Sequence, residues 1–254
     1  MKTAFKHTLA QWALLALLVI PLVSYIQKKA PTLFLVGDST MADKPYGNGN
    51  PEKGWGQVFP LYLQEGVKVQ NHAVNGRSTK SFRDEGRWDA MLQLLKPGDY
   101  VIIEFGHNDQ KDQDPKRYAA PETDYRHNLE RYVAEARAKK AIPVLATPIV
   151  RRRFVNGQLE DTHGKYPAVV RAVAAEKNVP LLDLERRTRE LVARYGEEKS
   201  KALYLHLGPN EYASLPDGRT DDTHLSAYGA FRVNDLVAEE LRKAVPELAA
   251  YLKK

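Results

Sequence analysis

The stretch Thr32-Leu-Phe-Leu-Val-Gly-Asp-Ser-Thr40 decides the fold, because its four apolar residues stop abruptly at Gly37. A short apolar run bounded by turn-forming residues predicts a strand that is buried on both faces, as in a parallel sheet. Ser39 follows at the carboxyl end of this strand, where open α/β sheets form their ligand crevice. Ser39 is therefore a candidate nucleophile, although Asp38 and Ser39 could instead only start a turn or cap a helix.

Outward from this strand, the same alternation of strand and helix continues along the chain. Further strands are expected in four segments: 67–74, 100–105, 142–147 and 179–183. Segments with apolar residues at helical spacing separate them. Strands that alternate with helices predict a doubly wound α/β domain with a parallel sheet. Because no linker or repeat follows residue 30, we expect residues 31–254 to form one domain.

Residues 1–30 form a separate segment, in which Lys2 and Lys6 precede an apolar stretch over residues 9–26. This pattern predicts an N-terminal signal peptide or a membrane anchor. No A-x-A cleavage site precedes Lys28 and Lys29, so the cleaved and the anchored forms both stay open. Either form predicts an exported protein, periplasmic or extracellular.

The composition excludes several classes of protein. The 254 residues carry a net charge of +6, but four lysines of residues 1–30 leave only about +2 for the rest of the chain. That charge is too small to predict binding to nucleic acid. The chain has no cysteine, which excludes disulfides and thiolate metal sites.

The other polar motifs at strand ends fit a serine nucleophile. A serine hydroxyl needs an imidazole to take its proton, and the imidazole needs a carboxylate to fix its tautomer. Asp221 and His224 supply both groups on one predicted short loop, followed by Ser226 as the cap of a helix. The N–H groups of Ser39 and Gly76, together with the side-chain amide of Asn108, are candidate donors to a developing oxyanion.

Four ordered blocks carry a resemblance to a known family: Gly37-Asp38-Ser39, Gly76, Gly106-x-Asn108-Asp109 and Asp221-x-x-His224. They resemble the blocks of the SGNH (GDSL-type) hydrolases. The residues within and around the blocks, such as Phe105-Gly-His-Asn-Asp109, are most similar to those of the rhamnogalacturonan acetylesterases of bacterial pectin-degrading systems.

The resemblance implies a three-layer α/β/α flavodoxin-like fold with a five-stranded parallel sheet of order 2-1-3-4-5. It implies a catalytic triad with Ser39 as nucleophile, His224 as base and Asp221 as the partner of His224. Ser39, Gly76 and Asn108 would form the oxyanion hole. The spacing of the family's last block favours Asp221 over the neighbouring Asp222, which we expect to be solvated.

Three other classes of protein are less consistent with the sequence than an SGNH-type serine hydrolase. A metal hydrolase could use His72, His107, Asp109 and His224, but the sequence has no metal-binding spacing, and no metal or cofactor is expected. The G-x-S-x-G motif of α/β-hydrolases is absent. A non-catalytic carbohydrate-binding protein would not need Ser39 and His224 together, so an enzyme is favoured.

The loops around the predicted crevice indicate the substrate. Segments 41–53 and 110–123 are polar and rich in Gly, Pro and charged residues, which favours a sugar over a fatty acyl chain. We therefore expect removal of acetyl groups from a plant cell-wall polysaccharide, with acetylated rhamnogalacturonan first. The alternatives are a lysophospholipase or acyl thioesterase of the same fold, or a deacetylase of xylan. Three residues after the fourth strand are candidate ligands of an acidic polymer: Arg151, Arg152 and Arg153.

Overall fold

The computed structural model describes residues 30–253. The predicted signal peptide or anchor, including its apolar stretch over residues 9–26, lies outside the described residues. Within the described residues, no helix is both long and apolar enough to cross a membrane.

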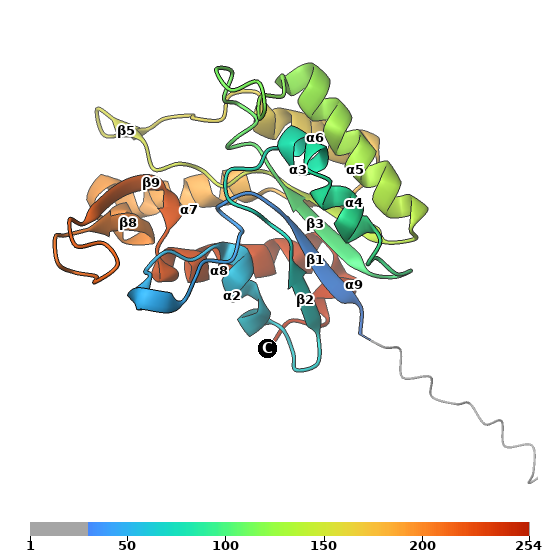
Figure 1. The fold of residues 1–254 in the computed structure, drawn as a ribbon, viewed down its shortest axis with the longest axis horizontal. Coiled ribbons are helices and arrows are strands. Elements are labelled where there is room, and N and C mark those ends of the chain that lie inside the picture. The colour runs from blue at the N-terminus through green and yellow to red at the C-terminus, as the bar shows by residue number, and fades with distance from the viewer. Residues whose placement is uncertain (1–29, 254) are drawn as a thin grey trace, which may run out of the picture. The chain divides into compact units, whose positions relative to one another are not determined.

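The central sheet contains five parallel strands: β1 (Thr32–Gly37), β2 (Lys68–Asn71), β3 (Tyr100–Glu104), β4 (Ile142–Ala146) and β7 (Leu181–Leu182). They are hydrogen-bonded in the order β2-β1-β3-β4-β7, which is the expected order 2-1-3-4-5. Figure 1 shows β1 between β2 and β3. β1 lies between β2 and β3, with Leu33 opposite Val69 on one side and Tyr100 on the other. The predicted fold class is confirmed.

Successive residues of β1 face two separate cores, because side chains alternate along a strand. Leu33 and Leu35 belong to one core, and Phe34 and Val36 to the other. The first core includes residues of α2 (Trp55–Val58), α7 (Leu184–Lys199), α8 (Ala227–Ala244) and α9 (Pro246–Ala249). The second includes residues of α3 (Thr79–Asp84), α4 (Arg87–Leu92), α5 (Arg126–Ala138) and α6 (Tyr166–Glu176). Helices on both faces of the sheet complete the three layers (Figure 1).

The main difference from the sequence-based expectation is the segment that carries Asp221 and His224. Instead of a short loop, it forms β9 (Arg219–Leu225), which pairs antiparallel with β8 (Tyr204–Leu207). The segment has no alternation of apolar and polar residues, so its pattern gave no strand signal. Ser226 then caps α8 as predicted, with its hydroxyl accepting the N–H of Gly229 at 3.0 Å.

Several shorter elements also differ from the expectation. A two-stranded hairpin, β5 (Phe154–Val155) and β6 (Gln158–Leu159), follows the arginine triplet and was not predicted. α2 is followed directly by a 3-10 turn, and α5 is preceded by a π-helical turn. Short turns of these kinds occur at Gly47–Gly49, Phe59–Tyr62, Pro121–Tyr125 and Ser200–Leu203.

Candidate active site

Ser39 is positioned by the tight end of β1. At Gly37 the backbone runs so close to β3 that a Cβ atom would lie 2.7 Å from the carbonyl oxygen of Glu104, so only glycine fits without a shift. The next residue, Asp38, is fully buried, and its Oδ1 accepts the backbone N–H and the hydroxyl of Thr40 at 3.0 and 2.9 Å. These bonds shape the turn that presents Ser39 to a pocket lined also by Gly76 and Asn108.

His224 and Asp221 form a hydrogen-bonded series with Ser39. His224 Nε2 lies 2.9 Å from Ser39 Oγ, and His224 Nδ1 lies 2.8 Å from Asp221 Oδ2. Burial opposes ionisation of Asp221, but hydrogen bonds from the ring and backbone of His224 outweigh it and lower the pKa of the carboxyl. An ionised Asp221 accepts the Nδ1–H of His224, which leaves the Nε2 lone pair free to face the serine hydroxyl.

Asp221 and Asp222 are adjacent, at the point where the register of β9 with β8 shifts, but their side chains have different partners. Asp221 Oδ2 also accepts from Arg219 at 2.5 Å, beside His224. Asp222 is not simply solvated as expected, since it binds Arg152 at 2.8 Å and His206 at 2.7 Å. The structure therefore pairs Asp221 with His224, while Asp222 ties β9 to the arginine segment and to β8.

The three candidate oxyanion donors line one pocket with the Ser39 side chain. Gly76 has a φ of +76°, a conformation that favours glycine. Within residues 30–253, the backbone N–H groups of Ser39 and Gly76 donate to no other group of the chain. Asn108 is 3% exposed, and its Nδ2 gives one hydrogen to the carbonyl oxygen of Arg77 at 2.9 Å. The structure brings these groups together, and their oxyanion role stays a prediction.

Asp109 connects the segments that carry Asn108 and Gly76. Its Oδ1 accepts the backbone N–H of Thr79 at 2.9 Å and the Thr79 hydroxyl at 2.5 Å, at the start of α3. Burial raises the pKa of Asp109 to about 7, although the two bonds from Thr79 oppose this. The loop after β3 and the loop after β2 are thus held in one arrangement.

A buried polar layer surrounds Asp38. His107 Nδ1 lies 3.2 Å from Asp38 Oδ2. Burial opposes ionisation of Asp38, but His107 and the bonds from Thr40 outweigh it and lower the pKa of the carboxyl to about 2. Burial and the charge of Asp38 raise the pKa of Glu104 to about 8, against the opposing hydrogen bond of 2.6 Å from Trp55. At neutral pH, Asp38 is therefore the main negative charge of this layer.

The pocket at Ser39 has a volume of about 440 Å³. Four charged residues line it, namely Glu52, Lys111, Arg151 and Arg219. Arg219 is neutralised by Glu52 at 3.3 Å and by Asp221. Glu52, Lys111 and Arg219 were not predicted from the sequence, because charged residues in irregular or polar segments follow no pattern that indicates a site.

Only one residue of the arginine triplet reaches this pocket. Arg151 lines it and donates to the carbonyl oxygens of His107 at 3.1 Å and Thr162 at 3.4 Å. Burial lowers the pKa of Arg151, and the charge of Asp38 opposes this.

The other two arginines are engaged elsewhere. Arg152 is 5% exposed and binds Asp222, the hydroxyl of Ser200 and the carbonyl oxygen of Glu197. Arg153 pairs with Glu160 at 2.9 Å. Neither lines the pocket at Ser39. The substrate-binding prediction for Arg152 and Arg153 therefore finds no support in the geometry.

The residues weighed as a metal site do not come together as one. His72 stacks on Phe34 and its ring contacts Gln70, whereas His107 and His224 line the pocket at Ser39. Across the described residues, no group of three or more His, Asp or Glu side chains has the arrangement that could hold a metal ion.

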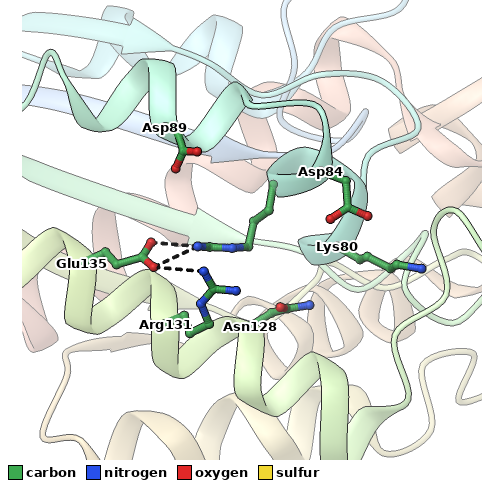
Figure 2. Close-up of a pocket in the computed structure, with 7 residues that line it drawn as sticks. Lys80, Asp84, Asp89, Asn128, Arg131 and Glu135 are labelled. Carbon is green, nitrogen blue, oxygen red and sulfur yellow. Dashed lines mark hydrogen bonds and ion pairs between the residues drawn. The ribbon is translucent and has the colours of Figure 1, made fainter.

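A second polar pocket, of about 270 Å³, lies among α3, α4 and α5 (Figure 2). Glu135 accepts two hydrogen bonds from Arg83, at 2.9 and 2.8 Å, and one from Trp88 at 2.5 Å. Arg131 also points to Glu135, at 3.4 Å. The pocket contains no side chain arranged with a base as Ser39 is with His224.

A Ser–His–Asp series at the carboxyl end of a 2-1-3-4-5 parallel sheet is the arrangement of an SGNH-type hydrolase. The chain belongs to the GDSL-like Lipase/Acylhydrolase family, whose model matches residues 35–230. This confirms the resemblance that the sequence blocks indicated.

Individual relatives are similar over most of the chain. The rhamnogalacturonan acetylesterase RhgT of Bacillus subtilis is 44% identical over 219 residues, which cover 86% of this chain and 92% of RhgT. The probable rhamnogalacturonan acetylesterase YesY of the same species is 35% identical, over 83% of this chain and 92% of YesY. Among solved structures, the B. subtilis protein YxiM matches with a TM-score of 0.72 and 27% identity, over 84% of this chain and 56% of YxiM.

Proposed function

We propose that this chain is a serine esterase that removes acetyl groups from an acetylated polysaccharide, with rhamnogalacturonan as the substrate. The observation that carries the proposal is the series of two hydrogen bonds, 2.9 and 2.8 Å long, that joins Ser39 through His224 to Asp221. The choice of polymer is supported by the 44% identity to RhgT, which is matched over 92% of its length.

The first half of the reaction transfers the acetyl group to the enzyme. Ser39 Oγ attacks the carbonyl carbon of the acetyl ester while His224 Nε2 takes the hydroxyl proton. The carbonyl oxygen gains the negative charge and accepts hydrogen bonds from the N–H groups of Ser39, Gly76 and Asn108. When the intermediate collapses, the bond to the sugar oxygen breaks, and that oxygen takes the proton from His224. Acetyl-Ser39 remains.

The second half returns the enzyme to its starting state. A water molecule gives a proton to His224 Nε2 and attacks the acetyl carbon, and the bond to Ser39 Oγ then breaks. Ser39 recovers its proton from His224, and acetate leaves. Asp221 stabilises the imidazolium form of His224 in both halves, because its low pKa keeps it ionised.

Arg151 is the residue that we assign to recognition of an acidic sugar. Its guanidinium forms no ion pair with an acidic side chain among the described residues, and it lines the pocket that holds Ser39. A partly buried cation without a directly paired carboxylate gains from binding one. A uronic acid near the acetylated sugar supplies one.

Acetate release tests the function directly. The wild type should release acetate from acetylated rhamnogalacturonan faster than from acetylated xylan or mannan, and the Ser39→Ala variant should release none. Faster hydrolysis of long-chain than of acetyl p-nitrophenyl esters would contradict the proposal in favour of a lipase or thioesterase.

The assignment of Arg151 needs its own comparison of substrates. Arg151→Ala should lower kcat/KM about tenfold or more on the acidic polymer and little on neutral p-nitrophenyl acetate. Arg153→Ala is the matched control, because Arg153 pairs with Glu160 outside the pocket. Equal activity of the two variants on the acidic polymer would remove Arg151 from recognition.

Export is proposed on the sequence alone. The basic start and apolar stretch of residues 1–30 favour passage of the domain across a membrane, where a polysaccharide substrate would be met. Mass spectrometry of the protein purified from its native host would show whether this segment is removed. Recovery of the activity only from the cytoplasm would contradict export.

A further inference from the structure

The side-chain amide of Asn108 has two hydrogen-bond partners, one that can only accept a hydrogen bond and one that can only donate one. Its Nδ2 lies 2.9 Å from the carbonyl oxygen of Arg77, which can only accept a hydrogen bond. Its Oδ1 lies 2.9 Å from Nζ of Lys111, whose ammonium group can only donate. In the reversed orientation, oxygen would face oxygen and the amide NH₂ would face the ammonium. The two partners therefore determine which way the amide points.

One N–H of the amide remains after these bonds. Nδ2 carries two hydrogens, and the carbonyl oxygen of Arg77 accepts one of them. Asn108 is nearly buried and lines the pocket with Ser39 and Gly76, so the second hydrogen is available to a group bound there. A half-turn of the amide would replace this donor with a carbonyl oxygen, which repels an oxyanion.

Lys111 is placed to prevent that half-turn. Its own backbone N–H donates to the carbonyl oxygen of Asn108 at 3.2 Å, which folds the chain back so that both residues belong to one turn. Among residues 30–253, its ammonium forms no ion pair with an acidic side chain, and it lines the pocket with Asn108. The ammonium group of this exposed lysine is therefore directed at the amide oxygen, and a charged donor there polarises the N–H bonds at the other end.

We propose that Lys111 is a positioning residue, which holds the Asn108 amide in the one orientation that offers an N–H to the oxyanion and strengthens that donor. The proposal rests on the esterase function proposed above. The carbonyl oxygen of Arg77 alone gives the amide one directional constraint, whereas the ammonium group supplies the second.

The test uses p-nitrophenyl acetate, a neutral ester that carries no group for a cation to recognise. Lys111→Met keeps the length of the side chain but removes the donor and the charge. We expect kcat to fall about tenfold with KM unchanged, a smaller loss than the roughly 10²–10³-fold expected for Asn108→Ala. Lys111→Arg, which keeps a cationic donor, should recover most of the activity. Lys116→Met is the matched control, since Lys116 is an exposed lysine of the same loop that does not line the pocket.

A double-mutant cycle separates positioning from a direct effect of the charge. In an Asn108→Ala background, Lys111→Met should lower kcat no further, because no amide remains to be held. A full additional loss in that background, or wild-type kcat in the single Lys111→Met variant, would overturn the inference. The activity of Ser39→Ala in the same assay tests the esterase proposal itself. Near-normal turnover by that variant would remove the reaction in which Lys111 acts.

Discussion

The cluster around Glu135, in the pocket among α3, α4 and α5, and the pocket at Ser39 contain similar residue types but differ in how completely their hydrogen-bonding groups are used. In the first of these, Glu135 accepts hydrogen bonds from the pocket residues Arg83 and Arg131 (Figure 2), and it also accepts one from Trp88. In the pocket at Ser39, by contrast, the N–H groups of Ser39 and Gly76 donate to no other described group. Arg151 there has no acidic partner among the described residues.

This difference separates a structural pocket from a reactive one. Polar groups that satisfy one another stabilise the fold and leave nothing for a ligand, while free donors and an uncompensated cation in a pocket gain from a bound anion. Substitutions in the pocket at Ser39 should therefore change activity and leave stability nearly intact. Substitutions at the pocket in Figure 2 should do the reverse.

The largest effect should follow from Ser39→Ala or His224→Ala, because nucleophile and base act as a unit. We expect kcat on an acetyl ester to fall by roughly 10⁴–10⁶, with the same loss when both changes are combined. Thermal unfolding should show a melting temperature close to that of the wild type. Losses that multiplied in the double variant would mean that the two residues do not act together.

A smaller effect distinguishes the two neighbouring aspartates. Asp221→Asn keeps an oxygen for the backbone N–H groups of Thr223 and His224 but disfavours the correct tautomer of His224, so kcat should fall by roughly 10³–10⁴. Asp222→Asn should act mainly on stability, because Asp222 binds Arg152 and His206. Steady-state kinetics of both folded variants measure this, and a larger loss of kcat for Asp222→Asn would reverse the assignment.

In the pocket of Figure 2, Glu135→Gln should cost stability and spare activity. The change leaves the largely buried guanidinium of Arg83 without its counter-charge, and we expect a loss of about 2 kcal/mol in the free energy of unfolding. For a domain of this size, the melting temperature should fall by roughly 4–8 °C. The kcat of the folded variant should equal that of the wild type, and a selective loss of kcat would break the contrast between the two pockets.

The smallest effect concerns the pH dependence of stability. The pKa of Asp109 is about 7 in the folded state, above its ordinary value of 3.8, so the native state binds more protons than the unfolded state between these values. Asp109 therefore contributes stability at low pH that is lost as the pH rises to about 7. Asp109→Asn should remove this contribution, because its amide can keep the bonds from Thr79 and place NH₂ where Oδ2 has no partner.

Melting temperatures at pH 5 and pH 8 measure this prediction. The wild type should lose more stability than the Asp109→Asn variant over that interval, and groups common to both proteins cancel in the comparison. Parallel curves for the two proteins would show that Asp109 is ionised throughout.

The sheet and the residues at its strand ends could be predicted because both follow from local patterns. The apolar run 33–36 and the turn residues after it predict a buried strand with Ser39 at its end, as the structure has it. β9 could not be predicted in this way, since Arg219 to His224 are all polar and show no apolar alternation that would mark a strand. The contacts of the individual arginines in the triplet 151–153 could not be predicted from the sequence either. The sequence places three arginines together, but only packing decides that Arg151 alone lines the pocket.

The site residues that could be predicted are those with a chemical requirement that the sequence order reveals. Ser39, Asp221 and His224, the proposed triad, occur in recognisable blocks, and the structure joins them by hydrogen bonds. Lys111 belongs to no such block, and a lysine in a polar loop is ordinarily solvated. Its relation to Asn108 depends on a turn geometry and a side-chain orientation that sequence patterns do not encode.

The distance along the chain between Ser39 and His224, 185 positions, determines when the site comes into existence. During synthesis, Ser39 leaves the ribosome long before β9 does, and until then its hydroxyl has no base. Closing so long a loop carries an entropic cost that the contacts of the β8–β9 hairpin must offset. Esterase activity therefore requires that this hairpin has docked, because the sheet alone leaves Ser39 without the imidazole of His224.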